Sequence, residues 1–288
     1  MRVKAFAKIN LGLEIVKKRE DNFHEIRTLF QTIELYDILE FKSREDGKIS
    51  LRGNDESVPW DEDNLIFKAV LLLKKQFGLS QGVEILVTKN IPPGKGLGGG
   101  SSDAAMTLYA LNKIWGLRLG MIDLMELGKI IGADVPYFLT GGLCLGLERG
   151  DEIVPLPDLV PLYCLLVFPS FTISTSLIYG QFQFPLTSEG KDSKINWFLK
   201  TRDFSLLENR LEETIFSLHP QLRAIKSLFQ SLGSDVSLVS GTGSAVFGIF
   251  KDRAKAYRGL GELKKKYLAL CVETISRERY WNRLSVGV

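Results

Sequence analysis

A glycine-rich segment between a strand and a helix constrains this chain more than any other feature. Residues 92–102 read Pro-Pro-Gly-Lys-Gly-Leu-Gly-Gly-Gly-Ser-Ser. The pattern over 83–91 predicts a strand that enters the segment, and 101–115 carries the apolar stripe of an amphipathic helix. Glycine permits close main-chain approach and positive φ angles, and a helix N-terminus attracts anions. The segment therefore predicts a binding site for a polyphosphate.

Two better-known phosphate loops do not fit this segment. A P-loop closes with Gly-Lys-Ser or Gly-Lys-Thr, whereas Gly99 is followed by Gly100. The G-x-G-x-x-G spacing of dinucleotide-binding folds is present at Gly94, Gly96 and Gly99, but two prolines separate it from the strand. The exit helix also leads into a second predicted helix over 121–131 instead of a strand ending in an acid. A flexible linker is the plain alternative, but linkers are not framed by a strand and a patterned helix.

The amino-terminal segment has the alternation of a strand. The odd positions of 7–15 are all apolar, and Lys8 and Asn10 stand between them. A strand with one buried face is predicted, with Lys8 and Asn10 side by side on its open face.

The remaining pattern mixes helices and strands without regular alternation. Helices are predicted over 63–78, 206–218, 221–232 and 254–267, and strands over 26–41, 47–52, 162–168 and 268–275. A strand, a glycine turn and a second strand are predicted over 237–250. A loop is predicted over 180–193. Three prolines punctuate 155–161, which predicts two domains, 1–155 and 156–288. The irregular order favours the α+β class.

Charge and cysteine content narrow the range of partners. The chain has 37 basic and 34 acidic residues, a net charge of +3 that is too balanced to indicate a nucleic-acid or membrane-surface partner. The three cysteines lie far apart, which fits a reducing cytoplasm. No apolar stretch is long enough to span a bilayer. We expect a cytoplasmic protein that binds neither nucleic acid nor membrane; the sequence does not indicate an oligomeric state.

The loop resembles the ATP loop of the GHMP kinase superfamily. Further segments resemble the branch of that superfamily that phosphorylates 4-diphosphocytidyl-2-C-methyl-D-erythritol, namely 7–13, 22–31, 132–138 and 240–247. The resemblance implies a two-domain GHMP kinase fold with the active site in the cleft between the domains. In that fold, domain 1–155 binds ATP and domain 156–288 lies on the substrate side.

The resemblance also implies an activity. It is ATP-dependent phosphorylation of the 2-hydroxyl of this small cytidylyl substrate, with Mg²⁺, in the non-mevalonate route to isoprenoid precursors. Another GHMP kinase, of the homoserine or phosphomevalonate type, is one alternative, and residues 22–24 and 28–31 argue against it. A non-catalytic nucleotide sensor on the same fold is the other, and the presence of both Lys8 and Asp134 argues against it.

Lys8 and Asp134 are the predicted catalytic residues. Asp134 lies in an apolar stretch, where a buried carboxylate needs a partner, and Lys8 is the candidate. The plain alternative is that Asp134 caps a turn before Pro136. The resemblance implies that Asp134 takes the proton of the acceptor hydroxyl and that Lys8 orients it.

The predicted nucleotide-binding residues come from the loop and from the helix after residue 63. They are Asn64, Pro92, Pro93, Gly94, Lys95, Gly96, Leu97, Gly98, Gly99, Gly100, Ser101 and Ser102. Lys95 is expected to add a mobile positive charge, and the two serines to cap the helix or to bind phosphate and magnesium. Asn64 could equally be a helix N-cap. No magnesium carboxylate can be identified, and Asp103 is expected only to favour the helix dipole.

The resemblance supplies the substrate-binding residues. They are Asn10, Phe23, His24, Thr175 and Tyr179. His24 is expected to bind the cytosine edge and Tyr179 to stack on the ring. Phe23 replaces the tyrosine common at its position, so a hydroxyl contact would be lost. The turn at 241–243 is a simple strand connection or, as the resemblance implies, lies against the phosphate loop; His219 is expected to be structural.

Overall fold

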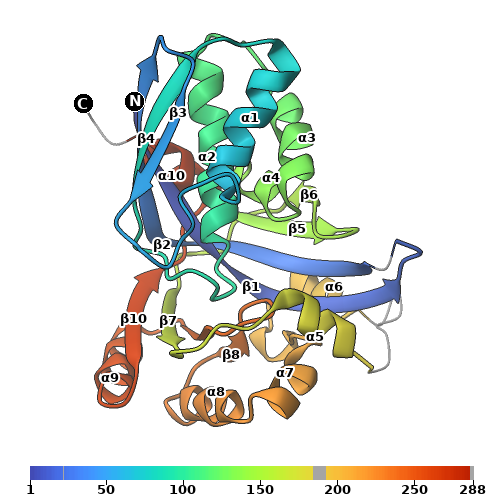
Figure 1. Cartoon of the computed structure of the whole chain (residues 1–288). Coiled ribbons are helices and arrows are strands. Elements are labelled where there is room, and N and C mark those ends of the chain that lie inside the picture. The colour runs from blue at the N-terminus through green and yellow to red at the C-terminus, as the bar shows by residue number, and fades with distance from the viewer. Residues whose placement is uncertain (22, 184–192, 286–288) are drawn as a thin grey trace.

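The computed structural model describes residues 1–21, 23–183 and 193–285. Their strands form a six-stranded sheet and a four-stranded sheet, seen in the upper and lower halves of Figure 1. Helices and antiparallel strands mix in both halves, so the predicted α+β class is confirmed. Asn22 and most of the loop predicted over 180–193 lie outside the described residues.

The first half is built on the six-stranded sheet, in the order β3–β4–β2–β5–β6 with β1 paired to β2. Its strands are β1 (Arg2–Lys18), β2 (His24–Arg44), β3 (Ile49–Gly53), β4 (Gly82–Thr88), β5 (Leu143–Leu147) and β6 (Glu152–Pro155). Its helices are α1 (Leu65–Phe77), α2 (Gly99–Ile114), α3 (Met121–Ile131) and α4 (Val135–Phe138). They pack on one side of the sheet (Figure 1). The apolar side chains of α2 from Ala104 to Leu111 belong to the core between these helices and the sheet.

The second half is built on the four-stranded antiparallel sheet, in the order β10–β7–β9–β8. Its strands are β7 (Tyr163–Phe168), β8 (Val236–Val239), β9 (Val246–Phe250) and β10 (Leu268–Glu273). Its helices are α5 (Thr175–Gln181), α6 (Lys194–Thr201), α7 (Glu212–Leu218), α8 (Gln221–Ser231) and α9 (Arg253–Leu263), with a 3₁₀ turn η1 (Phe204–Leu206). The last helix, α10 (Arg277–Asn282), returns to the core of the first half. The division at residue 155 stays a prediction.

Strand β1 is buried on both faces, so the prediction of an open face is wrong. Lys8 and Asn10 are each 3% exposed. The second half covers the polar face: the main-chain N–H of Leu13 donates to the carbonyl of Glu208 at 2.9 Å, and the turn at 240–243 lies over Asn10. Alternation predicted the strand correctly, but it could not show that a distant segment would cover the polar face.

Helix α2 begins two residues earlier than predicted. Its N-cap is Gly98, in a left-handed conformation with φ of 69° and no side-chain cap. Ser101 and Ser102 therefore lie inside the first turns, and the expectation that they cap the helix is wrong. Because the glycines can turn the chain directly into the helix, no serine is needed at the cap.

The helix predicted over 206–218 is only half as long. The chain makes the turn η1, runs extended, and becomes helical again in α7 from Glu212. Asn209 explains the break, since its Oδ1 accepts from the main-chain N–H of Leu211 at 3.0 Å. Its Nδ2 donates to the carbonyls of Val239 at 2.9 Å and Gly241 at 2.7 Å. Tertiary bonds of this side chain replace helical ones.

One further helix end and four whole helices differ from expectation. Helix α9 ends at Leu263, and 264–266 form turns, whereas a helix was predicted to Tyr267. The helices α4, α5, α6 and α10 were not predicted, and α5 includes Gly180 and Gln181 at the start of the predicted loop. The remaining predicted helices and strands are present with ends shifted by a few residues, which is the usual uncertainty of element boundaries.

Asn209→Ala is expected to destabilise the protein by about 2 kcal/mol or more, because it leaves two buried carbonyls without their donor. Denaturant unfolding measures the change in the free energy of unfolding. Gln230→Ala, on the exposed side of α8, is the matched control and should stay within about 0.5 kcal/mol of the parent. An equally small effect of Asn209→Ala would contradict the assignment.

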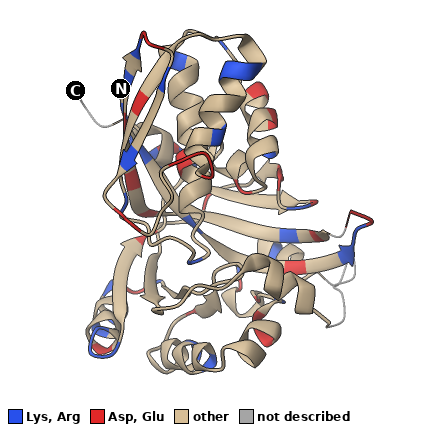
Figure 2. Cartoon of the chain, viewed as in Figure 1, with Lys and Arg blue, Asp and Glu red and all other residues tan. Residues whose placement is uncertain are grey.

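Acidic and basic residues are interspersed over both halves (Figure 2). Many form surface pairs, such as Arg223 with Glu213 and Lys265 with Glu262, which contribute little to stability. Within the described ranges, no helix combines the length and the apolar content that a bilayer span requires.

Candidate active site

The glycine loop is held in place by close contacts with both halves. Gly94, Gly96 and Gly98 have φ angles of 67°, 77° and 69°. A Cβ atom on Gly96 would lie 2.1 Å from the main-chain oxygen of Ser240, and one on Gly98 would lie 2.6 Å from Cζ of Phe138. The glycines therefore permit close approach to protein as well as to a ligand.

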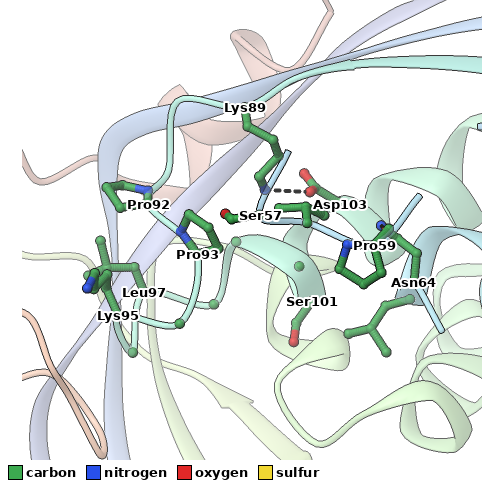
Figure 3. Close-up of a pocket in the computed structure, with 17 residues that line it drawn as sticks. Ser57, Pro59, Asn64, Lys89, Pro92, Pro93, Lys95, Leu97, Ser101 and Asp103 are labelled. Atoms are coloured by element: carbon green, nitrogen blue, oxygen red, sulfur yellow. Dashed lines mark hydrogen bonds and ion pairs between the residues drawn. The ribbon is translucent and has the colours of Figure 1, made fainter. Parts of the chain in front are cut away.

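A cavity of about 370 Å³ opens beside the loop. Figure 3 shows the loop on one side and Pro59 with Asn64 on the other. The predicted nucleotide residues that line it are Asn64, Pro92, Pro93, Gly94, Lys95, Gly96, Leu97, Gly98, Gly99, Gly100 and Ser101. Ser102 does not line it, because its side chain is fully buried. Volume and lining fit a small polar ligand.

Asn64 has two structural roles at the cavity wall. Its Oδ1 accepts from the main-chain N–H of Ile66 at 2.9 Å, so the N-cap interpretation is confirmed. Its Nδ2 donates to the carbonyl of Pro59 at 2.7 Å, which fixes the neighbouring wall. A direct contact with the nucleotide stays a prediction.

Lys89 joins two buried carboxylates behind the loop. Its Nζ lies 2.7 Å from Asp103 Oδ2 and also binds Asp37 (Figure 3 shows the pair with Asp103). Asp37 Oδ1 accepts from the main-chain N–H groups of Asn90 at 2.6 Å and Ile91 at 2.8 Å. The network ties β2, the start of the loop and helix α2 together. The expectation that Asp103 only favours the helix dipole is wrong, because the side chain is buried and accepts a hydrogen bond from Lys89.

Burial raises the pKa of Asp103 to about 8, against the opposing attraction of Lys89. Between the unfolded value of 3.8 and about 8, the folded chain retains a proton that the unfolded chain releases. Binding of this proton by the folded chain stabilises it against unfolding. This contribution to the free energy of unfolding is fully present below about pH 4 and is lost as the pH rises through about 8.

We therefore expect the parent to lose on the order of 1 kcal/mol or more, relative to Asp103→Asn, between pH 5 and pH 9. Urea unfolding at both pH values measures the difference. Glu45→Gln, at an exposed carboxyl, is the control and should follow the parent. Parallel curves for the parent and Asp103→Asn would refute the raised pKa.

Lys95 is not the mobile charge that the sequence suggested. The residue is 8% exposed. Its Nζ donates to the carbonyl of Pro169 at 2.8 Å and to that of Phe171 at 2.6 Å. Both acceptors belong to the segment that follows β7, so Lys95 spans the two halves.

Lys8 and Asp134 lie together. Lys8 Nζ is 3.3 Å from Asp134 Oδ2 and donates to Asn10 Oδ1 at 2.6 Å. Asp134 precedes α4 without capping it, so the turn-cap alternative is not supported. The lysine side chain is 4% exposed, but the carboxylate is 34% exposed, so the expectation of a buried aspartate is wrong. An accessible carboxylate held by a buried ammonium suits proton transfer to and from a bound ligand.

The turn at 240–243 joins this pair to the loop. Ser240 Oγ donates to the carbonyl of Gly96 at 2.9 Å. A Cβ on Gly241 would lie 3.1 Å from Asn10 Oδ1 and 3.8 Å from Lys8 Nζ. The turn therefore lies against the glycine loop, as the family resemblance implies, and is more than a simple strand connection.

Three of the predicted substrate residues, His24, Thr175 and Tyr179, form a second group, whereas Asn10 is bonded to Lys8. The rings of His24 and Tyr179 have centroids 5.3 Å apart, and the hydroxyl oxygens of Thr175 and Thr242 are 3.0 Å apart. Burial lowers the pKa of His24 and raises that of Tyr179. Phe23 is 57% exposed and does not join the group in this arrangement. His219 stacks on Phe171 with centroids 4.9 Å apart, as its structural interpretation predicts.

Comparison with known proteins identifies the family. The GHMP kinase N-terminal domain model matches residues 64–142, and the GHMP kinase C-terminal model matches 195–269. A 4-diphosphocytidyl-2-C-methyl-D-erythritol kinase of Syntrophus aciditrophicus is 40% identical over 278 residues, which is 96% of this chain and 99% of the relative. The chain belongs to the 4-diphosphocytidyl-2-C-methyl-D-erythritol kinase family. A family member from Brevibacillus brevis is 41% identical over 89% of each chain.

Solved structures agree with this family assignment. A crystal structure of 4-(cytidine 5'-diphospho)-2C-methyl-D-erythritol kinase matches with a TM-score of 0.80 and 32% identity, covering 95% of this chain and 99% of that one. Homoserine kinase from Cytophaga hutchinsonii has a TM-score of 0.75 at 19% identity, over 96% of this chain and 95% of that one, and shows the fold alone. The GHMP kinase fold predicted from the sequence is confirmed, and the chain is a kinase.

Several cavity residues of this family member were not predicted from its sequence. They are Ser57, Val58, Pro59, Leu65, Lys89 and Asp103. The loop 57–59 carries no motif, and its position depends on the bond between Asn64 and Pro59. The only sequence signal for Asp103 was its place beside the loop.

Metal-binding carboxylates are not evident. Among the described residues, no three His, Cys, Asp or Glu side chains cluster as a metal site. The hydroxyl of Ser102 is buried and has no hydrogen-bond partner among the described residues. Ser101 lines the cavity. The hydroxyl of Ser101 therefore fits a minor contribution to a cation that is held mainly by phosphates, whereas that of Ser102 does not reach the cavity.

Proposed function

We propose that the protein transfers the γ-phosphoryl group of ATP to the 2-hydroxyl of 4-diphosphocytidyl-2-C-methyl-D-erythritol, giving the 2-phosphate and ADP. The ion pair of Lys8 and Asp134 next to the glycine loop carries this proposal. A Cβ on Gly98 would lie 3.2 Å from Lys8 Cε, so the pair adjoins the loop directly. The names of relatives aligned over nearly the whole chain supply the substrate. The reaction would serve the non-mevalonate route to isoprenoid precursors.

Each part of the site has a role in this reaction. The main-chain N–H groups of 94–100 and the N-terminus of α2 hold the triphosphate. Asp134 Oδ2 accepts the proton of the attacking hydroxyl, a contribution typically worth roughly 10²- to 10⁴-fold. Lys8 orients Asp134 and offsets the charge that develops during transfer. Phosphoryl transfer needs mainly positioning and charge compensation, which these groups supply.

Mg²⁺ would enter with ATP, as it usually does in kinases, and would neutralise phosphate charge. Ser101, which lines the cavity, is the protein residue that would contact it. The carboxylates nearest the cavity are already engaged, since Asp103 pairs with Lys89. The protein's own contribution is therefore the main-chain cradle and the Lys8–Asp134 pair.

The cytidylyl end would bind at the second group. We assign the cytosine ring to the aromatic pair His24 and Tyr179, with Thr175 and Asn10 contacting the polar parts of the substrate. Phe23 would close over the ligand from its exposed position. We further propose that domain 1–155 binds ATP, that domain 156–288 lies on the substrate side, and that the protein works in the cytoplasm, since its cysteines are free.

A substrate panel tests the function. ADP release is measured with 4-diphosphocytidyl-2-C-methyl-D-erythritol, homoserine and phosphomevalonate under identical conditions. Turnover with the cytidylyl compound alone is the expected result. Turnover with homoserine or phosphomevalonate alone would overturn the proposed substrate, and none with any compound would favour the sensor.

A further inference from the structure

The ammonium group of Lys95 lies next to a predicted phosphate site but is turned away from it. In Figure 3 the side chain extends away from Asn64, Ser101 and Asp103. Its two hydrogen-bond acceptors among the described residues are the carbonyls of Pro169 and Phe171, at 2.8 Å and 2.6 Å.

A buried ammonium is costly unless it is well bonded. Burial lowers the pKa of Lys95, and two carbonyl dipoles stabilise its charge. Reaching a phosphate would break both bonds and open a contact between the halves. The geometry therefore favours a link within the protein over a ligand contact.

Phe171 is a junction of several contacts. Its carbonyl accepts from Ser244 Oγ at 2.6 Å as well as from Lys95, and its ring stacks on His219. The carbonyl of Lys95 accepts from the main-chain N–H of Ala245 at 3.1 Å. Lys95 thus binds the segment after β7 through its side chain. Through its main chain it binds Ala245, the residue before strand β9.

The same segment leads to the substrate group. Helix α5 begins at Thr175, shortly after Phe171, and carries Tyr179. A change in the loop at 94–98 would reach this helix through Lys95. Because a coupling between two sites is reciprocal, the same link would act in both directions.

We infer that Lys95 is a positioning residue that couples nucleotide binding in the glycine loop to the order of segment 169–179, the substrate side of the site. The coupling to substrate affinity rests on the proposed function. The coupling to the segment itself does not, because it depends only on nucleotide binding and on contacts within the chain.

Hydrogen exchange tests the link without the substrate. ADP should slow amide exchange in 169–179 of the parent, and Lys95→Met should remove that slowing while protection at the start of α2 persists. Lys75→Met, the same change at an exposed position of α1, should behave as the parent. An unchanged response of 169–179 in Lys95→Met, or no response in the parent, would overturn the inference.

Calorimetry adds the effect on affinity. The ratio of ADP dissociation constants without and with 4-diphosphocytidyl-2-C-methyl-D-erythritol should depart from one in the parent, within the roughly 5- to 150-fold range of such couplings. In Lys95→Met this ratio should approach one. The dissociation constant of ADP without the substrate should change by less than about threefold. A loss of ADP affinity of tenfold or more without substrate would instead make Lys95 a phosphate ligand.

A second variant covers the case in which Lys95→Met does not fold. Ser244→Ala removes the other donor to the Phe171 carbonyl and should weaken the exchange response of 169–179 in the same direction. If Lys95→Met does not fold and ADP slows amide exchange in 169–179 of Ser244→Ala as much as in the parent, the contacts at Phe171 do not carry the link and the inference fails. If the parent does not bind the cytidylyl compound but shows the exchange response, the proposed substrate fails and the link stands.

Discussion

Asp134→Ala is expected to lower kcat by about 10²- to 10⁴-fold, because the acceptor hydroxyl would lose the general base that we propose for it. Nucleotide affinity should change little, since Asp134 is not among the residues that line the cavity beside the loop. ADP release with the cytidylyl substrate measures kcat, and calorimetry with ADP measures the affinity. A loss in kcat without a loss in binding is the signature of a group that acts on the reacting atoms.

Two further variants separate chemistry from structure. Asp134→Asn keeps the shape of the side chain but removes the basic oxygen, so kcat should fall about as far as in the alanine variant. Glu45→Ala removes an exposed carboxylate that is distant from Asp134 in the sequence, and it should leave kcat and stability as in the parent. Parent-like turnover in Asp134→Asn would show that another group accepts the proton.

The pairing of Lys8 with Asp134 shows how far the sequence led and where it stopped. Local pattern placed Lys8 on a strand and Asp134 after a helix end, but it left a turn-cap interpretation open for Asp134. The family resemblance favoured the pair, and the 3.3 Å separation with no capping bond agrees with it. The exposure of the carboxylate was not predicted, because it depends on how the two halves pack.

Two lysines near the loop show why side-chain partners could not be predicted. Lys95 stands among glycines and was expected to face the phosphates, but its acceptors lie in a segment of the other half. Lys89 was not among the predicted site residues, although it joins Asp37 and Asp103 at the cavity wall. Local sequence gives a charge and its approximate place, whereas its partner is set by contacts between residues far apart in the chain.

Asn209 makes the same point for secondary structure. The apolar spacing of 206–218 suits one helix, and local propensity alone gives no reason to break it. The side chain instead bonds to Val239 and Gly241, and so supports the turn that lies over Lys8 and Asn10. A tertiary contact that serves the site overrides the helical pattern.

Gly98→Val is expected to weaken nucleotide binding by at least about tenfold and to reduce turnover with it. The residue has a φ of 69°, a conformation that costs a β-branched side chain roughly 1–3 kcal/mol. Its Cβ would also lie 2.6 Å from the ring of Phe138, which is fully buried, and 3.2 Å from Lys8 Cε. To relieve the contact, the loop would move towards the cavity or Lys8 would leave Asp134. Calorimetry with ADP and steady-state kinetics measure both effects.

Gly78→Val separates backbone strain from the contacts of the loop. Gly78 has a φ of 61°, close to that of Gly98, but a Cβ there would meet no atom within 4 Å. The substitution should therefore lower stability by roughly 1–2 kcal/mol while leaving ADP affinity and kcat unchanged. If Gly98→Val merely lost the same stability and kept full ADP affinity, the cradle would not depend on the position of this residue. A loss of binding confined to Gly98→Val would instead show that the packing of the loop against Phe138 and Lys8 shapes the phosphate site.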